Sequence, residues 1–193
     1  MGAHAFVIAL PPSEGKAVGG NARVPWRPAS GTFGRPLGGW REQVADALRA
    51  AGGGDAKLLG VKGAHLERAR TVNAGLVGSP TLPAWQRYTG VVWDHLDLAS
   101  MPAAPRNTAI GRIVVPSGLM GIVRADDPVP DYRLKMGARL SSFGAMAAWW
   151  RDDLTDALAA HLHGTTLVDL LPQEHRGALD WERIEGAVRI DLV

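Results

Sequence analysis

The chain has 193 residues and a formal net charge of +2 at pH 7, with 46% hydrophobic and 21% charged residues. This composition excludes a largely disordered chain, and the absence of cysteine excludes disulfides, thiolate metal sites and a cysteine nucleophile. The length predicts one domain over residues 1–193, and so small a net charge does not by itself demand a polyanionic partner.

The first half of the chain predicts one buried strand followed by helices. Residues 4–10 form an apolar run closed by Pro11 and Pro12, which is typical of a central strand entering a loop. The stretch from there to Gly39 is rich in glycine and proline and is predicted to be irregular. Helices are predicted over residues 40–51, 56–59 and 64–76.

The second and third of these helices predict a helical hairpin over about residues 55–77. In a helix-hairpin-helix motif, such a hairpin presents backbone N–H groups to a DNA phosphate. Gly60 and Gly63 flank the turn here, but His65 stands where the motif usually has another glycine. The alternative is an ordinary helical hairpin with a solvated basic face. The cations of this segment are Lys57, Lys62, Arg68 and Arg70.

In the second half of the chain, helices and strands alternate. Helices are predicted over residues 89–99 and 147–163, and strands over 112–115, 165–171 and 187–193. In the last strand Val188 and Ile190 alternate with Arg189 and Asp191, which is typical of a half-exposed strand. An unpaired terminal strand invites a partner strand, so we expect a homo-oligomer at this edge. The interleaved order predicts a single α/β (α+β) domain with a mixed β-sheet flanked by helices.

The segment from Ser117 to Arg139 holds the greatest concentration of candidate site residues. It follows a predicted strand, and loops held by a rigid scaffold are where sites tend to lie. Arg124 and Arg133 can each bind a phosphate or carboxylate through two N–H groups, or instead form an ion pair with Asp127. The candidate anion-binding residues of the whole chain are Ser13, Lys16, Ser117, Arg124, Asp127, Tyr132 and Arg133.

Lys16 lies in the turn after the first strand, where α/β folds often bind ligands. It can pair with an anion, act as a base if it is desolvated, or belong to a plain surface turn. Asp94, Glu14 and Asp127 are the candidate acid or base groups that would act with it. Tyr132 can stack on a nucleobase or serve as a half-buried core residue.

Neighbouring acid–histidine pairs do not predict a metal site in this chain. Asp94 precedes His95, and Glu174 precedes His175. Adjacent helical positions do not share a face, and the spacing differs from that of known helical ligand pairs. We therefore expect no metal and no cofactor. No apolar run reaches the length of a membrane span, so no membrane partner is expected.

Four blocks of the sequence resemble the YaaA (DUF328/UPF0246) peroxide stress resistance family, and they occur in family order. They are Leu10–Lys16, Tyr88–Leu96, Ser117–Met136 and Val168–His175. The resemblance implies a cytoplasmic protein of the oxidative-stress response, linked to lowering damage from peroxide and free iron. It also implies a mixed α/β fold with a positively charged cleft and a helix-hairpin-helix element, for which DNA binding is proposed.

The chain departs from the family pattern at its end. Family members usually continue past the last strand into a lysine-rich segment of the type Phe-x-Lys-x-x-Lys-Gly, which does not occur before Val193. We therefore expect a short and specialised member of the family.

Two functions follow from the resemblance and the residues together. The first is DNA binding through a positively charged cleft, whose further nucleic-acid-binding residues would be Lys62, Arg68, Lys135 and Arg139. The alternative is an enzyme that acts in the same cleft on a small anionic or nucleobase-like or nucleotide-like substrate, in a specialised biosynthetic pathway. The sequence leaves open whether the protein is an enzyme.

Overall fold

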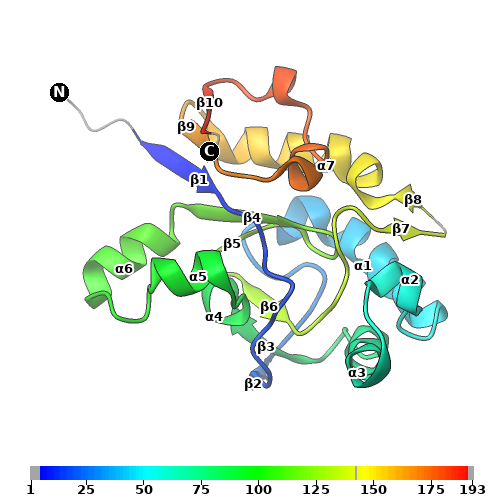
Figure 1. Cartoon of the computed structure of the whole chain (residues 1–193). Helices are drawn as coiled ribbons and strands as arrows, with labels where there is room; N and C mark the ends of the chain where they lie inside the picture. Colours follow the sequence, from blue (N-terminus) through cyan, green and yellow to red (C-terminus); the bar gives the residue numbers. More distant parts are fainter. Residues whose placement is uncertain (1–4, 142, 191–193) are drawn as a thin grey trace.

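The computed structural model of the chain describes residues 5–141 and 143–190. It has the predicted α/β class, with a mixed β-sheet flanked by helices (Figure 1). The strands are β1 (Phe6–Ala9), β2 (Asn21–Pro25), β3 (Pro80–Pro83), β4 (Ile113–Ser117), β5 (Gly121–Arg124), β6 (Pro128–Pro130), β7 (Arg139–Leu140), β8 (Gly144–Ala145), β9 (Thr166–Asp169) and β10 (Ala187–Arg189). The helices are α1 (Gly34–Ala50), α2 (Ala56–Leu59), α3 (Gly63–Ala74), α4 (Ala84–Arg87), α5 (Val91–Leu96), α6 (Ala103–Ile110), α7 (Met146–Leu162), α8 (Gln173–Arg176) and the 3₁₀ helix η1 (Trp181–Arg183).

The largest sheet has the strand order β10-β9-β1-β4-β5. The first four strands run parallel to their neighbours, and β5 returns antiparallel to β4 at one edge. In the centre, Ile8 of β1 lies opposite Val168 on one side and Ile113 on the other. The loops that follow β1, β4 and β9 therefore leave the sheet at the same edge, which is where open α/β sheets tend to bind ligands.

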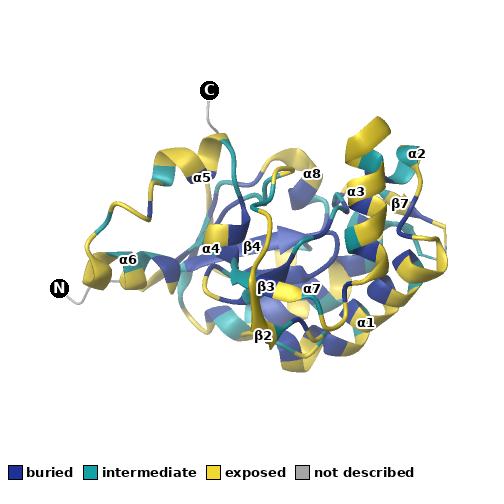
Figure 2. Cartoon of the chain, turned by 90° about the horizontal axis from the view of Figure 1, so that it is seen from below, coloured by how far each residue is buried: buried dark blue, intermediate teal, exposed yellow. Residues whose placement is uncertain are grey.

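The core forms between this sheet and the helices α1 and α7, which contact each other. Every residue of β4 is buried, as expected for a central strand that is covered on both faces (Figure 2). The side chains of Trp150, Leu154 and Leu158 recur at four-residue steps along α7 and are fully buried. This confirms the predicted helix over residues 147–163 to within a residue at each end.

The stretch up to Gly39 was predicted to be irregular, and that prediction is wrong in two places. Residues 21–25 form β2, which belongs to a second sheet of order β2-β3-β6, and α1 begins at Gly34, six residues before the predicted start at Trp40. A Cβ atom at Gly34 would lie 1.9 Å from the carbonyl oxygen of Ala29. Glycine is therefore needed at position 34 for close packing against Ala29, and it does not exclude this residue from the helix.

Two pairs of helices lie at opposite ends of the molecule, α5 with α6 and α2 with α3 (Figure 1). The helix predicted over residues 89–99 is shorter, because Asp97 has a left-handed backbone with φ of 38° and ends α5 at Leu96. Helix α6 was not predicted. No helix within the described ranges has both the length and the apolar character that a membrane crossing requires.

The last described strand, β10, lies at the edge of the largest sheet. Its three residues, Ala187–Arg189, are all exposed, and the predicted continuation over residues 191–193 lies outside the described part of the chain. The homo-oligomer expected at this edge stays a prediction.

Candidate functional site

Two adjoining hollows lie beside the turn that follows β1. The first, which we call the small cavity, has a volume of about 70 Å³, and the second, which we call the α3 groove, has a volume of about 470 Å³. Both are lined by Glu14, Lys16, Tyr132 and Arg133. The small cavity adds Ser13, Lys135, Met136, Glu174 and His175, and the α3 groove adds Val61, His65, Arg68, Val72, Thr89 and Asp131.

The position of Lys16 is fixed by backbone contacts on both sides of it. Lys16 forms an isolated antiparallel bridge with Tyr88, and the N–H of Thr89 donates to the carbonyl of Gly15. The Lys16 ammonium donates to the carbonyl of Ser13 at 3.0 Å and lies 4.2 Å from the centre of the Tyr132 ring. Among the described residues no carboxylate lies within ion-pairing distance of it.

This environment makes Lys16 a much weaker base than a surface lysine. Burial, the largest cause, lowers the pKa of its ammonium from 10.5 to about 7. The nearby charges of Arg133 and Arg87 lower the pKa further, and Asp131 opposes the change. The lowered pKa increases the share of neutral amine near pH 7, and a neutral amine can act as a base or a nucleophile.

Beneath Lys16 lies a buried pair of tyrosines. The hydroxyls of Tyr88 and Tyr132 are 3.0 Å apart, and both residues are 2% exposed. Burial raises the pKa of Tyr132 to about 12, although hydrogen bonds with Ser117 and Tyr88 oppose the change. Ser117 is itself buried, and its hydroxyl accepts a hydrogen bond from the N–H of Met120 at 3.1 Å. These hydroxyls bond to one another, so Tyr132 offers a ligand its ring and not its hydroxyl.

The end of β4 can lie close to the segment that carries Tyr132 because residue 118 is glycine. A Cβ atom at Gly118 would lie 2.7 Å from the carbonyl oxygen of Lys135 and 2.8 Å from that of Leu134. The Ser117-Gly118 pair is therefore part of the support for the site, since it lets the chain after β6 lie against β4.

The cations around the hollows are paired with carboxylates. Arg133 Nη2 lies 2.9 Å from Glu14 Oε2, and Lys135 binds the other carboxylate oxygen of the same residue. These two cations, with Lys135 first, hold the pKa of Glu14 below its usual value of 4.5. On the α3 side, Arg68 binds Asp131 at 2.5 Å. The carboxylates offset much of the positive charge that the sequence places here.

Arg133 is held by hydrogen bonds to α3 and to α2. Its backbone N–H donates to Asn73 Oδ1 at 2.9 Å, and its Nε donates to the carbonyl of Leu59 at 2.8 Å. Asn73 is fully buried. The guanidinium therefore lies against the walls of both hollows in a fixed position, with its Nη2 toward Glu14.

Arg124 and Asp127 lie away from both hollows. Because β4 and β5 are antiparallel, Arg124 lies opposite Val114, at the other end of the hairpin from Ser117. Its guanidinium binds Asp126 at 2.5 and 2.7 Å. Asp127 accepts hydrogen bonds from the N–H and hydroxyl of Thr32 and from the N–H of Arg124. The structure thus gives Asp127 a role in holding loops together.

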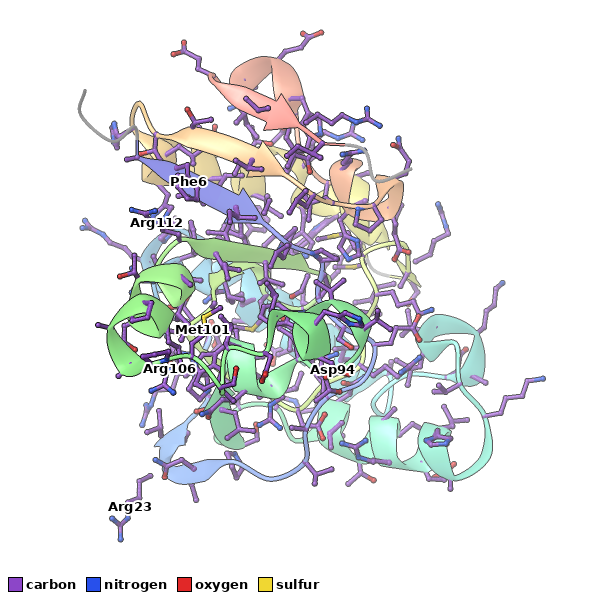
Figure 3. The ribbon with its side chains drawn as sticks, turned by 60° about the vertical axis from the view of Figure 1, so that its left-hand side comes forward. Phe6, Arg23, Asp94, Met101, Arg106 and Arg112 are labelled. Carbon is purple, nitrogen blue, oxygen red and sulfur yellow. The ribbon has the colours of Figure 1, made fainter. Side chains whose placement is uncertain are left out.

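Three more predicted site residues also lie elsewhere. Asp94 is exposed on α5, where it accepts a hydrogen bond from the N–H of Gly90 and lines a separate hollow of about 290 Å³ (Figure 3). Lys62 is exposed in the turn before α3, and Arg139 is exposed on β7. None of these three lines the small cavity or the α3 groove.

Sequence reasoning missed His175 as part of this site. His175 is 8% exposed and lines the small cavity, and within the described chain its Nδ1 has no hydrogen-bond partner. Burial lowers the pKa of His175 from 6.5. Its position in the sequence could have indicated His175, because the residue follows β9 at the same edge of the sheet from which the turn containing Lys16 leaves. Among the described residues, His, Cys, Asp and Glu form no group of three able to hold a metal ion.

Comparison with known proteins adds the family to this geometry. The family model described as "Peroxide stress protein YaaA" matches residues 7–192. The UPF0246 protein SCO2297 of Streptomyces coelicolor is 37% identical over 171 residues, which cover 86% of this chain and 64% of that protein. The UPF0246 protein CE1889 of Corynebacterium efficiens is 37% identical over 159 residues, covering 80% of this chain and 62% of that protein.

The chain spans less than two thirds of the length of these relatives. The match to the family model extends over almost all of the described residues and includes the turn after β1, the segment after β6 and α8. This chain belongs to the YaaA peroxide stress protein family.

Proposed function

We propose that the α3 groove and the small cavity form the active site of an enzyme, which acts on a small anionic substrate of nucleobase or nucleotide size. The observation that carries this proposal is the state of Lys16. A lysine in an ordinary surface turn is hydrated and charged, whereas burial lowers the pKa of Lys16 to about 7 at the junction of two hollows. Perturbed titratable groups in a hollow are typical of catalytic sites.

The shape of the site supports a small ligand. The volume of the α3 groove, about 470 Å³, lies within the range of about 300–1,000 Å³ that is common for small-molecule sites. Arg68 and Arg133 supply donors for an anionic group at the walls of this groove, and Lys135 supplies donors in the adjoining small cavity. Because Glu14 and Asp131 bind these cations in the free protein, an incoming anion has to compete with them. That competition favours a small ligand of defined shape over a polyanion held by charge alone.

The proposal can be tested by ligand-induced stabilisation. A ligand that binds only the folded state raises the melting temperature, so a thermal-shift screen of nucleotides, nucleobases and small organic anions should reveal stabilising compounds. Lys16→Ala and Arg133→Gln should abolish the response. Arg124→Gln is the matched control, because Arg124 is also an ion-paired arginine but lies outside both hollows. A full ligand response in the Lys16→Ala protein would refute the assignment.

A second candidate is nucleic-acid binding, as the family resemblance suggests. It is favoured by three exposed cations on and beside α3, which are Lys62, Arg68 and Arg70. Helices α2 and α3 form a short hairpin, and the turn between them contains Gly60 in the left-handed conformation. Filter binding of duplex and single-stranded DNA at two salt concentrations tests it. Binding through phosphates should be insensitive to sequence and weaken steeply with salt. Absence of binding at low salt would remove this candidate and leave the enzyme proposal intact.

The two candidates would serve the same cellular role. The family's name refers to peroxide stress, and we propose that this chain contributes to that response in the cytoplasm through the site around Lys16.

A further inference from the structure

Lys16 differs from the other cations at the two hollows in its partners. Its one hydrogen bond within the described chain goes to the uncharged carbonyl of Ser13, and the centre of the Tyr132 ring lies 4.2 Å from its nitrogen. Arg133, Lys135 and Arg68 each have a carboxylate partner, and Lys16 has none among the described residues. A lysine that is desolvated and lies near other cations is the type of lysine that reacts with carbonyl carbons.

His175 provides a second group at the same cavity. The residue is 8% exposed, and the structure describes no hydrogen-bond partner for its buried Nδ1. An unpaired polar nitrogen in a buried position costs free energy, and His175 carries one while its side chain also lines the small cavity. The cavity, at about 70 Å³, has room for a group of a few heavy atoms by the measure of ~10–15 Å³ for each water-sized probe.

We propose that Lys16 forms an imine with a small aldehyde or ketone that carries an anionic group, and that His175 transfers the protons of this reaction. The inference rests on the proposed function, and it narrows the substrate to carbonyl compounds. The reacting carbonyl lies in the small cavity between Lys16 and His175. The anionic group lies toward Arg133 and Lys135, which line the same cavity.

The chemical step balances without any further reagent. The neutral amine of Lys16 attacks the carbonyl carbon, and the C=O π bond breaks to give a carbinolamine. The imidazole of His175 takes a proton from the nitrogen and delivers it to the alkoxide oxygen, which completes the neutral carbinolamine. The hydroxyl then takes a second proton, drawn from solvent through the imidazole, and leaves as water, so that a protonated imine remains. Return of that proton from the nitrogen to solvent gives one imine and one water for each amine and carbonyl.

Reductive trapping tests the proposal directly. The protein is incubated at pH 7 with glyoxylate or pyruvate and sodium cyanoborohydride, and with acetaldehyde as the uncharged probe. Intact-mass measurement and peptide mapping then locate the secondary amine. Lys57 and Lys62, which line neither hollow, serve as internal references. Because desolvation favours the neutral, nucleophilic form of the Lys16 amine, Lys16 should react on the order of 100-fold faster than these.

Variants separate the two roles. Lys16→Arg keeps the positive charge and should lose the adduct at residue 16, whereas Lys62→Arg should leave it unchanged. His175→Gln should slow trapping by at least about 10-fold, as expected for loss of a proton-transfer group, while glyoxylate binding measured by thermal shift persists. Peptide mapping of the wild-type protein gives a result that does not depend on whether a variant folds.

The outcomes are distinct from those of the proposed function. A dominant adduct at Lys16 with an anionic probe supports the inference. Equal labelling of all lysines, or no adduct with any of the three probes, overturns it. A stabilising anion whose effect requires Arg133, combined with an absence of trapping, would leave the proposed function standing and refute the imine.

Discussion

Replacing Lys16 with methionine should stabilise the protein at neutral pH, and the gain should shrink as the pH rises. Burial lowers the pKa of Lys16 from 10.5 to about 7. A basic group whose pKa is lower in the folded state binds fewer protons when the chain is folded than when it is unfolded. The wild-type protein therefore loses stability as the pH falls from about 10.5 to about 7. Methionine is similar in length and does not titrate, so the variant lacks this loss.

The size of the effect follows from the two pKa values. The interval from 10.5 to about 7 corresponds to about 5 kcal/mol, at roughly 1.4 kcal/mol for each tenfold change in proton affinity. The difference between variant and wild type should be about 4 kcal/mol at pH 7 and roughly 2 kcal/mol at pH 9. Because the Lys16 side chain is partly exposed, solvent screening makes these values upper limits.

Urea unfolding at pH 7, 8 and 9, followed by tryptophan fluorescence, measures this difference. Lys62→Met is the matched control, because Lys62 is exposed and forms no ion pair within the described residues. Its difference from wild type should be small and independent of pH. A Lys16→Met difference that stays constant between pH 7 and pH 9 would show that Lys16 titrates normally, and the reasoning behind both the proposed function and the imine would fail with it.

Three further variants test the support of the site. Tyr132→Phe removes one hydroxyl of a buried pair that is 3.0 Å apart. It should cost about 1–3 kcal/mol of unfolding free energy, because the Tyr88 hydroxyl loses that partner. The double variant with Tyr88→Phe should cost less than the sum of the two single changes, and additive costs would contradict the pairing. Arg41 is fully buried and donates to the backbone carbonyls of four residues, so Arg41→Met should cost roughly 3–5 kcal/mol in urea unfolding, and a loss below about 1 kcal/mol would refute this account. Gly118→Ala places a Cβ atom 2.7 Å from the carbonyl oxygen of Lys135. The variant should lose about 1–3 kcal/mol of unfolding free energy and respond less to ligands in the thermal-shift screen. A full ligand response would show that β4 does not set the position of the site.

The sequence alone predicted those features that depend on local patterns. The four-residue spacing of apolar side chains predicted α7, and the apolar run before Pro11 predicted β1, because each pattern depends on the geometry of a single element. Glycine led to a wrong prediction where its role depends on a tertiary contact. Residue 34 is glycine because Ala29 leaves no room for a side chain, and a contact of that kind has no local signature.

For the site, the residue types could be predicted from the sequence, but which of them lie together could not. The prediction placed Lys16, Arg133 and Arg124 in one cleft, whereas the structure brings Lys16 and Arg133 together and leaves Arg124 at the far end of an antiparallel hairpin. Whether a cation is free or paired depends on contacts such as Glu14 with Arg133, which are 119 residues apart. The Lys16 ammonium lies over the rings of Tyr88 and Tyr132, which come from segments far from it in the sequence. Side-chain periodicity records only what each element does by itself, so the charge state of Lys16 and the cavity it shares with His175 were decided by how distant segments pack.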